Sequence, residues 1–432
     1  MSIDKSEILT SVRKFIKKQK NTFTPGETYV MSSGAVWDDD DVAAIVEIAL
    51  DRWYGGTRYS YEFERHLASF IKQRHVTLCN SGSSANLLAM SALMSRQLKG
   101  RELKKGDEVI TVAAGFPTTV NPIVQNGLVP VFVDVSLPTY NALPHAIEEA
   151  ISDKTRAIFI AHTLGNPLKT QELRDLADRN ELWLISDCCD ALGAEYLNKP
   201  LPTFADISTF SFYPAHHIST GEGGAVSTDS PLLNKIIHSF RDWGKDCWCV
   251  PGKDNTCGKR YGWQLGDLPC AFDHKYIFSE IGYNLKATDI QAALGITQMK
   301  KLPKFIEARA ETWKYYRESF DELKKFFVIP EPTLRSTPSW FGFALTVRDN
   351  APFNRNDLVT FLENNRIGTR MLFAGNLTKQ PAYADARYRV SGALKKTDTI
   401  MNNTFWLGVS PVVTPDMRQY VVEKMMEFIK SK

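Results

Sequence analysis

Six short apolar segments between residues 107 and 228 constrain the fold more than any other feature of this sequence. They alternate with longer stretches of helical character and consist largely of β-branched and other apolar residues. The segments are DEVITVAA (107–114), VPVFVDV (129–135), RAIFIAHT (156–163), LWLISDCC (182–189), DISTFSF (206–212) and GAVST (224–228). This pattern predicts an α/β fold whose strands are buried on both faces of a mostly parallel central sheet with crossover helices.

The remaining segments predict three further parts. Residues 4–18 place Ile8, Leu9, Val12, Phe15 and Ile16 on one stripe of a helix, so we expect an N-terminal helical arm over 1–33. The large domain would cover 34–325. A proline-rich stretch after it would act as a hinge to a smaller C-terminal α/β domain (326–432), with a strand in WFGFALTV (340–347) and a helix in NRNDLVTFLENN (354–365).

Composition excludes several classes of protein. The 432 residues carry a net charge of only +3, which argues against nucleic acid or a membrane surface as a partner. The N-terminus is charged from its fourth residue, and no apolar run reaches the roughly 18 residues of a membrane-spanning helix. We therefore expect a cytoplasmic protein in which the seven cysteines do not form disulfides.

Two segments have the features of a site for a phosphate-bearing ring. NSGSSANLLAM (80–90) has a strand end, a turn of small residues and a helix start, so Gly82, Ser83 and Ser84 could donate to a phosphate. Asp187 ends a predicted strand, where ligands of open α/β sheets bind, and its carboxylate could pair with a protonated pyridine nitrogen. Either feature alone is common in proteins without such a ligand.

Together with GFPTTVNP (115–122), SDCCDALGAEY (186–196), SFYPAHH (211–217) and GYNLKATDIQAALG (282–295), these segments resemble the sugar-nucleotide branch of the fold-type I pyridoxal phosphate aminotransferases. The resemblance implies an aspartate aminotransferase-like fold. It places Phe116 on the pyridine ring, Asp187 at its nitrogen, and Gly82, Ser83 and Ser211 at the phosphate. Asn284 would reach the phosphate of a neighbouring subunit, which implies a homodimer.

The sequence departs from the aminotransferase pattern at the cofactor lysine. Counting from the flanking motifs, that position holds His216, and an imidazole cannot form the covalent link that anchors pyridoxal phosphate. The cofactor would therefore be pyridoxamine phosphate, held noncovalently, with His216 as a general base. His217 is the adjacent alternative. Aminotransferases of this branch usually carry His where this chain has Asp190 and Tyr213, which indicates altered chemistry.

Four cysteines form a second pattern. Cys189, Cys247, Cys249 and Cys257 are spaced C-x57-C-x-C-x7-C, and the last three lie in an aperiodic loop over 243–273. The spacing fits zinc ribbons poorly, whereas a [2Fe–2S] cluster takes four cysteines with varied spacing. From the residues alone, iron–sulfur, zinc and no metal all stay open. Cys188 is the competitor for the first ligand position, and we interpret Cys79 and Cys270 as structural.

The histidine replacement together with this cysteine spacing resembles the CDP-4-keto-6-deoxy-D-glucose 3-dehydrases. The resemblance implies a pyridoxamine phosphate- and [2Fe–2S]-dependent dehydration at C3, used in 3,6-dideoxyhexose formation for O-antigens, with a separate flavin and iron–sulfur reductase as electron donor. Asp190 and Tyr213 would favour elimination over transamination. His162, Arg370 and Asn376 lie in segments that contact substrate in related enzymes.

Three alternatives stay open at this point. The first is a dehydrase with the same cofactors that acts on a TDP-linked 4-keto-2,6-dideoxy sugar. The second is a true aminotransferase, which the missing lysine disfavours. The third is a catalytically inactive, zinc-stabilised partner of another sugar enzyme.

Overall fold

The structure is a computed structural model that describes residues 4–19, 22–249 and 253–432. An eight-stranded sheet forms its centre, in the order β1-β9-β8-β5-β4-β2-β3-β14. Strands β3, β2, β4, β5 and β8 are parallel, and β9 runs antiparallel to both β8 and β1. The strands are β1 (His75–Cys79), β2 (Glu108–Val112), β3 (Val129–Val133), β4 (Thr155–Ala161), β5 (Trp183–Asp187), β8 (Ile207–Ser211), β9 (Gly224–Thr228) and β14 (Arg389–Val390).

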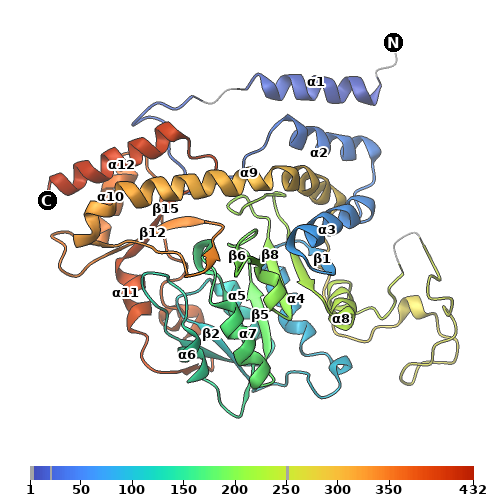
Figure 1. The fold of residues 1–432 in the computed structure, drawn as a ribbon. Coiled ribbons are helices and arrows are strands. Elements are labelled where there is room, and N and C mark those ends of the chain that lie inside the picture. The colour runs from blue at the N-terminus through green and yellow to red at the C-terminus, as the bar shows by residue number, and fades with distance from the viewer. Residues whose placement is uncertain (1–3, 20–21, 250–252) are drawn as a thin grey trace.

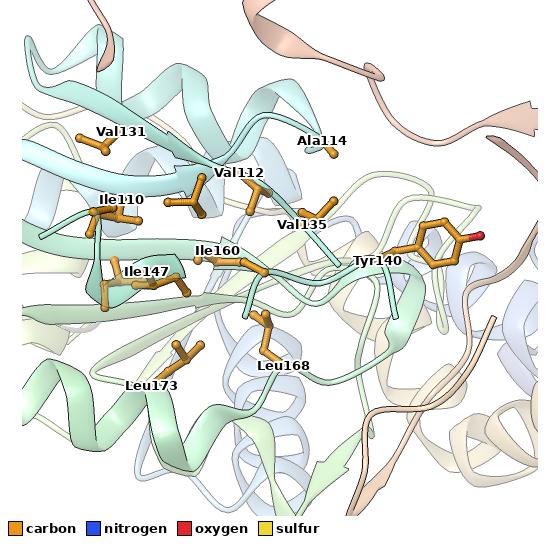
Figure 2. Close-up of a cluster of buried hydrophobic side chains, with 14 of the residues drawn as sticks. Ile110, Val112, Ala114, Val131, Val135, Tyr140, Ile147, Ile160, Leu168 and Leu173 are labelled. Atoms are coloured by element: carbon orange, nitrogen blue, oxygen red, sulfur yellow. The ribbon is translucent and has the colours of Figure 1, made fainter. Parts of the chain in front are cut away.

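The predicted α/β fold with a mostly parallel sheet is therefore confirmed. Each of the six predicted segments contains a strand, and five of these strands are buried along their whole length because helices cover the sheet. The covering helices include α4 (Gly82–Ala92), α5 (Pro117–Gln125), α6 (Pro144–Glu148), α7 (Thr170–Arg179) and α8 (Pro231–Arg241). Figure 2 shows part of the core between the sheet and α6 and α7, where Ile110 and Ile160 pack with Ile147 and Leu173.

A smaller antiparallel sheet follows in the C-terminal part, in the order β10-β12-β15-β13. The predicted boundary after residue 325 lies next to β10. This part contains β10 (Phe327–Val328), β12 (Gly342–Val347), β13 (Thr369–Met371), β15 (Thr404–Gly408), α10 (Arg355–Asn364), α11 (Lys395–Asn403) and α12 (Pro415–Lys430). A third sheet, in the order β11-β6-β7, joins β11 (Ser336–Thr337) to β6 (Glu195–Tyr196) and β7 (Lys199–Pro200).

The 31-residue helix α9 (Asp289–Ser319) runs along both parts of the molecule (Figure 1). Its first half packs against α2 (Asp39–Asp51) and α3 (Arg58–Ile71), and its second half joins the core of the small sheet through Trp313 and Tyr316. One continuous helix therefore connects the N-terminal helices α2 and α3 with the core of the small sheet.

The N-terminal arm contains the predicted helix, α1 (Lys5–Lys17), which Asp4 caps through a bond from the Glu7 backbone N–H. None of its residues is buried, and Phe15 is 65% exposed. The apolar stripe is thus formed, but its side chains remain partly or largely exposed. None of the helices in the described ranges has both the length and the apolar character needed to cross a bilayer.

Candidate active site

A cavity of about 430 Å³ lies at the carboxyl ends of the central strands, between the large sheet and the small one. This is the edge where open α/β sheets bind ligands. Ten of the predicted site residues line it: Gly82, Ser83, Phe116, Asp187, Cys189, Asp190, Ser211, Tyr213, His216 and Arg370. Because Arg370 comes from β13, residues distant in the sequence form one site.

Asp187 lies at the base of this cavity with its carboxylate fixed on several sides. Its Oδ2 accepts hydrogen bonds from Asn86 Nδ2 at 2.9 Å and Thr119 Oγ1 at 2.7 Å. Its Oδ1 accepts one from the Cys189 backbone N–H at 3.0 Å. A buried carboxylate with neutral donors but little solvent is suited to a cationic partner, such as the protonated nitrogen of a pyridine ring.

The N-terminus of α4 meets Ser211 at one wall of the cavity. A Cβ added to Gly82 would lie 2.4 Å from Ser211 Cβ, so only glycine permits this close approach. Ser81 caps the helix by accepting from the Ser84 backbone N–H, and Ser83 is exposed toward the cavity. Because the free N–H groups of a helix N-terminus attract anions, Gly82, Ser83 and Ser211 form a seat suited to a phosphate. Ser84 lies in the first helical turn but does not line the cavity.

Phe116, the N-cap residue of α5, lines the same cavity. Its side chain is 50% exposed, an unusual state for a phenylalanine at a cavity wall, and its ring meets Phe373 edge-to-face at 6.2 Å. An open aromatic face of this kind is suited to stacking on a planar ring. The phosphate seat, Asp187 and Phe116 together fit the phosphate, nitrogen and ring face of a pyridoxal-type cofactor.

His216 enters the cavity from the loop after β8. Its Nδ1 lies 3.5 Å from Asp190 Oδ1, and neither this nitrogen nor Asp190 Oδ2 has a hydrogen-bond partner in the structure. Burial, assisted by the positive charge of Arg309, lowers the pKa of His216 to about 3. Burial and the nearby Asp187 raise the pKa of Asp190 to about 8. At neutral pH the imidazole is therefore an uncharged base.

His217 is placed differently from its neighbour. It is buried, and its Nε2 interacts with the Ser339 backbone carbonyl at 2.9 Å. It is not among the residues that line the central cavity, whereas His216 is. Tyr213 on the same loop is half-exposed at the cavity.

Two predicted substrate residues lie outside the cavity. His162 is buried, its Nε2 lies 2.6 Å from Ser186 Oγ, and its Nδ1 accepts from the Leu168 backbone N–H. Asn376 is also buried and donates to Asp398. Both polar side chains therefore form hydrogen bonds within the protein interior. A sequence pattern does not reveal such bonds.

Asn284 does not line the cavity of its own chain. It lies on the loop before α9, where its Oδ1 accepts from Lys286 Nζ at 2.8 Å.

The cysteines are divided between two places. Cys189 lines the central cavity, whereas Cys247, Cys249 and Cys257 line a separate small pocket in the loop together with His274. This loop has no helix or strand over the described parts of 243–273, as predicted, and extends away from the sheet (Figure 1). Over residues 4–19, 22–249 and 253–432, no three acidic, cysteine or histidine side chains are arranged to hold a metal ion.

Several cavity residues were missed by the sequence analysis. They are Ser33, Asn86, Thr118, Thr119, Ala161, Ala215, Phe341, Met371, Phe373 and Trp406. Asn86 and Thr119 lie inside the motifs NSGSSANLLAM and GFPTTVNP, so these motifs could have indicated both residues as parts of the site. Phe341 and Trp406 come from the small sheet, and no local pattern predicts that they reach the cavity.

The fold and this cavity define an enzyme of the fold-type I pyridoxal phosphate-dependent class. The chain belongs to the DegT/DnrJ/EryC1/StrS aminotransferase family, whose model matches residues 36–426. Sugar-nucleotide 3-dehydratases are among its relatives.

Three relatives illustrate the similarity. The chain is 54% identical over 406 residues to lipopolysaccharide biosynthesis protein RfbH of Salmonella typhimurium, covering 94% of this chain and 93% of the relative. It is 51% identical over 426 residues to dTDP-4-dehydro-2,6-dideoxy-D-glucose 3-dehydratase of Saccharopolyspora spinosa, covering 98% and 92%. The structure of the E. coli GDP-4-keto-6-deoxy-D-mannose-3-dehydratase with bound hydrated PLP matches with a TM-score of 0.83 and 29% identity, covering 92% of this chain and all of that one.

Proposed function

We propose that this enzyme removes the C3 hydroxyl of a nucleotide-linked 4-keto-6-deoxy sugar. The observation that carries the proposal is His216, a neutral base in a cavity built for a pyridoxal-type cofactor, where no lysine is among the described lining residues. The relatives named as 3-dehydratases support the same reaction. CDP-4-keto-6-deoxy-D-glucose is the proposed substrate, in 3,6-dideoxyhexose formation for O-antigens, and a TDP-linked 4-keto-2,6-dideoxy sugar is the alternative.

Pyridoxamine phosphate is the proposed cofactor. The described residues of its site offer a carboxylate for the ring nitrogen, donors for the phosphate and an aromatic surface for the ring, but no amine that could form a covalent link. Asp187 would hold the ring nitrogen, Gly82, Ser83 and Ser211 the phosphate, and Phe116 the ring face. When bound, the cofactor supplies an amine for the sugar ketone and an electron sink.

Four residues that line the cavity would then have separate roles in the reaction. His216 would take one proton from C4′ of the cofactor, because its imidazole lines the cavity and burial keeps it unprotonated at neutral pH. Asp190 Oδ1 lies 3.5 Å from Nδ1 of this ring and, with Tyr213, would favour elimination over transamination. Tyr213 and Arg370 line the cavity, and their phenol and guanidinium are suited to binding a sugar and its diphosphate.

The proposal includes a [2Fe–2S] cluster on Cys189, Cys247, Cys249 and Cys257 and a flavin and iron–sulfur reductase as electron donor. The described arrangement does not bring these four sulfurs to one centre, because Cys189 lies in the central cavity and the other three in the loop pocket. The cluster therefore rests on the family resemblance, and we derive no step through it. A cytoplasmic homodimer completes the proposal.

The test is turnover of CDP-4-keto-6-deoxy-D-glucose with added pyridoxamine phosphate, comparing His216→Asn with His217→Asn. We expect His216→Asn to lower the rate of C3–O cleavage by a factor on the order of 10² to 10⁴. His217→Asn should retain most of the activity, because His217 lies outside the cavity. Retained cleavage in a folded His216→Asn variant would assign the base elsewhere. Formation of an amino sugar from an amino donor would instead favour an aminotransferase, and the same assay with the TDP-linked sugar decides the nucleotide.

A further inference from the structure

Arg309 is a buried cation that the proposed chemistry has not used. It lies in α9 and is 0% exposed, which makes it one of the largest fully buried side chains. The four hydrogen bonds that the structure describes for its guanidinium all run to backbone carbonyl oxygens. A buried arginine usually pairs with a carboxylate, because an uncompensated charge is costly in a protein interior.

The four carbonyls belong to two segments that meet at the cavity. Nη2 donates to the carbonyl oxygens of His216 at 2.9 Å and Ala215 at 3.3 Å. Nη1 donates to those of Trp340 at 3.3 Å and Phe341 at 3.5 Å. One planar group thus joins the loop that carries the proposed base to the segment that enters the small sheet.

This contact matters because the His216 side chain has few other restraints. Its Nδ1 makes no hydrogen bond, and Asp190 lies 3.5 Å away. The imidazole packs on the Phe341 ring with the two centroids 5.2 Å apart. The backbone of residue 216 and the place of Phe341 therefore set where the imidazole points, and Arg309 holds both.

We infer that Arg309 is a positioning residue, whose guanidinium holds the His216 backbone and the Phe341 segment so that the side chain at position 216 faces the cofactor. The rigid fork of an arginine can hold several carbonyls in fixed directions, whereas the ammonium of a lysine acts as a single point. The inference rests on the proposed function only for what His216 does with that position.

The first experiment reads the position of side chain 216 without any sugar. In a His216→Lys background, the lysine amine can condense with the aldehyde of added pyridoxal phosphate to form a carbon–nitrogen double bond and release water. The rate of this reaction is followed by visible absorbance and confirmed by mass after borohydride reduction. Because a displacement of about 1 Å can lower such a rate about 100-fold, we expect Arg309→Gln to slow capture at least tenfold.

Arg355→Gln is the matched control. Arg355 also donates to backbone carbonyls, but those of Met401 and Thr404 rather than of His216 and Phe341, so its variant should capture pyridoxal phosphate at the parental rate. Arg309→Lys keeps the charge and should fold if Arg309→Gln does not, yet it should still slow capture. Parental capture in a folded Arg309 variant would overturn the inference.

The second experiment separates positioning from general damage in the native background. Loss of the C4′ proton of pyridoxamine phosphate is measured with the 4-keto sugar present, in a double-mutant cycle of Arg309→Lys and His216→Asn. If Arg309 acts through His216, its substitution lowers the rate in the wild-type background and adds no loss in the His216→Asn background. Equal losses in both backgrounds would mean a structural role only. If no sugar reacts but capture still depends on Arg309, the proposed function fails while the positioning role stands.

Discussion

Asn86 is bound to Asp187 on one side and to Thr209 on the other. Its Nδ2 donates to Asp187 Oδ2 at 2.9 Å, and its Oδ1 accepts from Thr209 Oγ1 at 2.6 Å. The amide is therefore fixed in one orientation, with its donor toward the carboxylate. Asp187 is thus held in place before any cofactor arrives, which limits the entropy lost on binding.

Replacing Asp187 by Asn should weaken binding of pyridoxamine phosphate about 10- to 100-fold, because the cofactor nitrogen loses a charged partner. Titration of the cofactor by fluorescence measures this. Asp134→Asn is the control, because Asp134 also accepts several hydrogen bonds but from Lys396 and Thr397 at the start of α11. Unchanged affinity in Asp187→Asn would argue against a cofactor nitrogen at this position.

Gly82→Ala should displace the N-terminus of α4 from Ser211, because the new Cβ would lie 2.4 Å from that side chain. We expect a loss of stability of about 1–3 kcal/mol and weaker cofactor binding. In Gly262→Ala the added Cβ would meet nothing closer than 3.6 Å, so this control should change neither quantity. Thermal unfolding and cofactor titration are the measurements. A stable Gly82→Ala enzyme with full affinity would place the phosphate elsewhere.

Iron and acid-labile sulfide in anaerobically purified variants test the proposed cluster. We expect Cys189→Ser and Cys247→Ser to lose both, and Cys270→Ser, which alters an exposed cysteine, to keep about two of each per chain. A Cys189→Ser protein that keeps its iron would leave the three loop thiols with a different fourth ligand. Zinc without sulfide in the parent protein would remove the cluster from the proposal.

Mixed dimers test the expected role of Asn284. If each site uses His216 of one chain and Asn284 of the other, Asn284→Ala and His216→Asn proteins are each impaired alone. Mixing them after dissociation should restore activity, because each mixed dimer regains one intact site. No recovery in verified mixed dimers would mean that Asn284 acts within its own chain or not at all.

Stability should fall on acidification in part because of His162. Burial lowers its pKa to about 3 from 6.5, so between these values the unfolded chain binds a proton that the folded chain does not. The folded state therefore loses stability as the pH falls through this window, by up to about 1.4 kcal/mol per pH unit for one such group. His162→Gln should flatten this dependence and cost about 1–3 kcal/mol at neutral pH, since the Leu168 N–H loses its acceptor. Urea unfolding at several pH values measures both, and an unchanged slope would contradict the assignment.

Six strands of the sheet were predictable because their segments are short, rich in β-branched and other apolar residues, and alternate with helical stretches. Local chemistry also indicated Gly82, which begins α4, and Asp187, which ends β5, whereas His216 was found by counting from the motifs that carry the family resemblance. β14 was not predictable, since its Arg389–Val390 pair carries no strand pattern of its own.

Residues that act over long sequence distances escaped the sequence analysis. Arg309 lies 93 positions from His216, and nothing in its helix distinguishes it from a solvated arginine until the packing is known. His162 and Asn376 show the converse, because a polar residue inside a matching motif can be taken up by structural hydrogen bonds.

The edge strand β14 has a consequence for how a substrate enters. The chain leaves the small sheet after β13, pairs Arg389 and Val390 with β3 of the large sheet, and returns to β15. Arg389 also forms an ion pair with Glu108 on β2, at 2.6 Å between Nη2 and Oε2. A movement that separated the large sheet from the small sheet would break the pairing of β14 with β3. Helix α9 also connects these two parts. Because the walls of the cavity are tied together at β14 and along α9, we expect a ligand to enter past side chains such as Tyr213 and Arg370 without a large separation of the two parts.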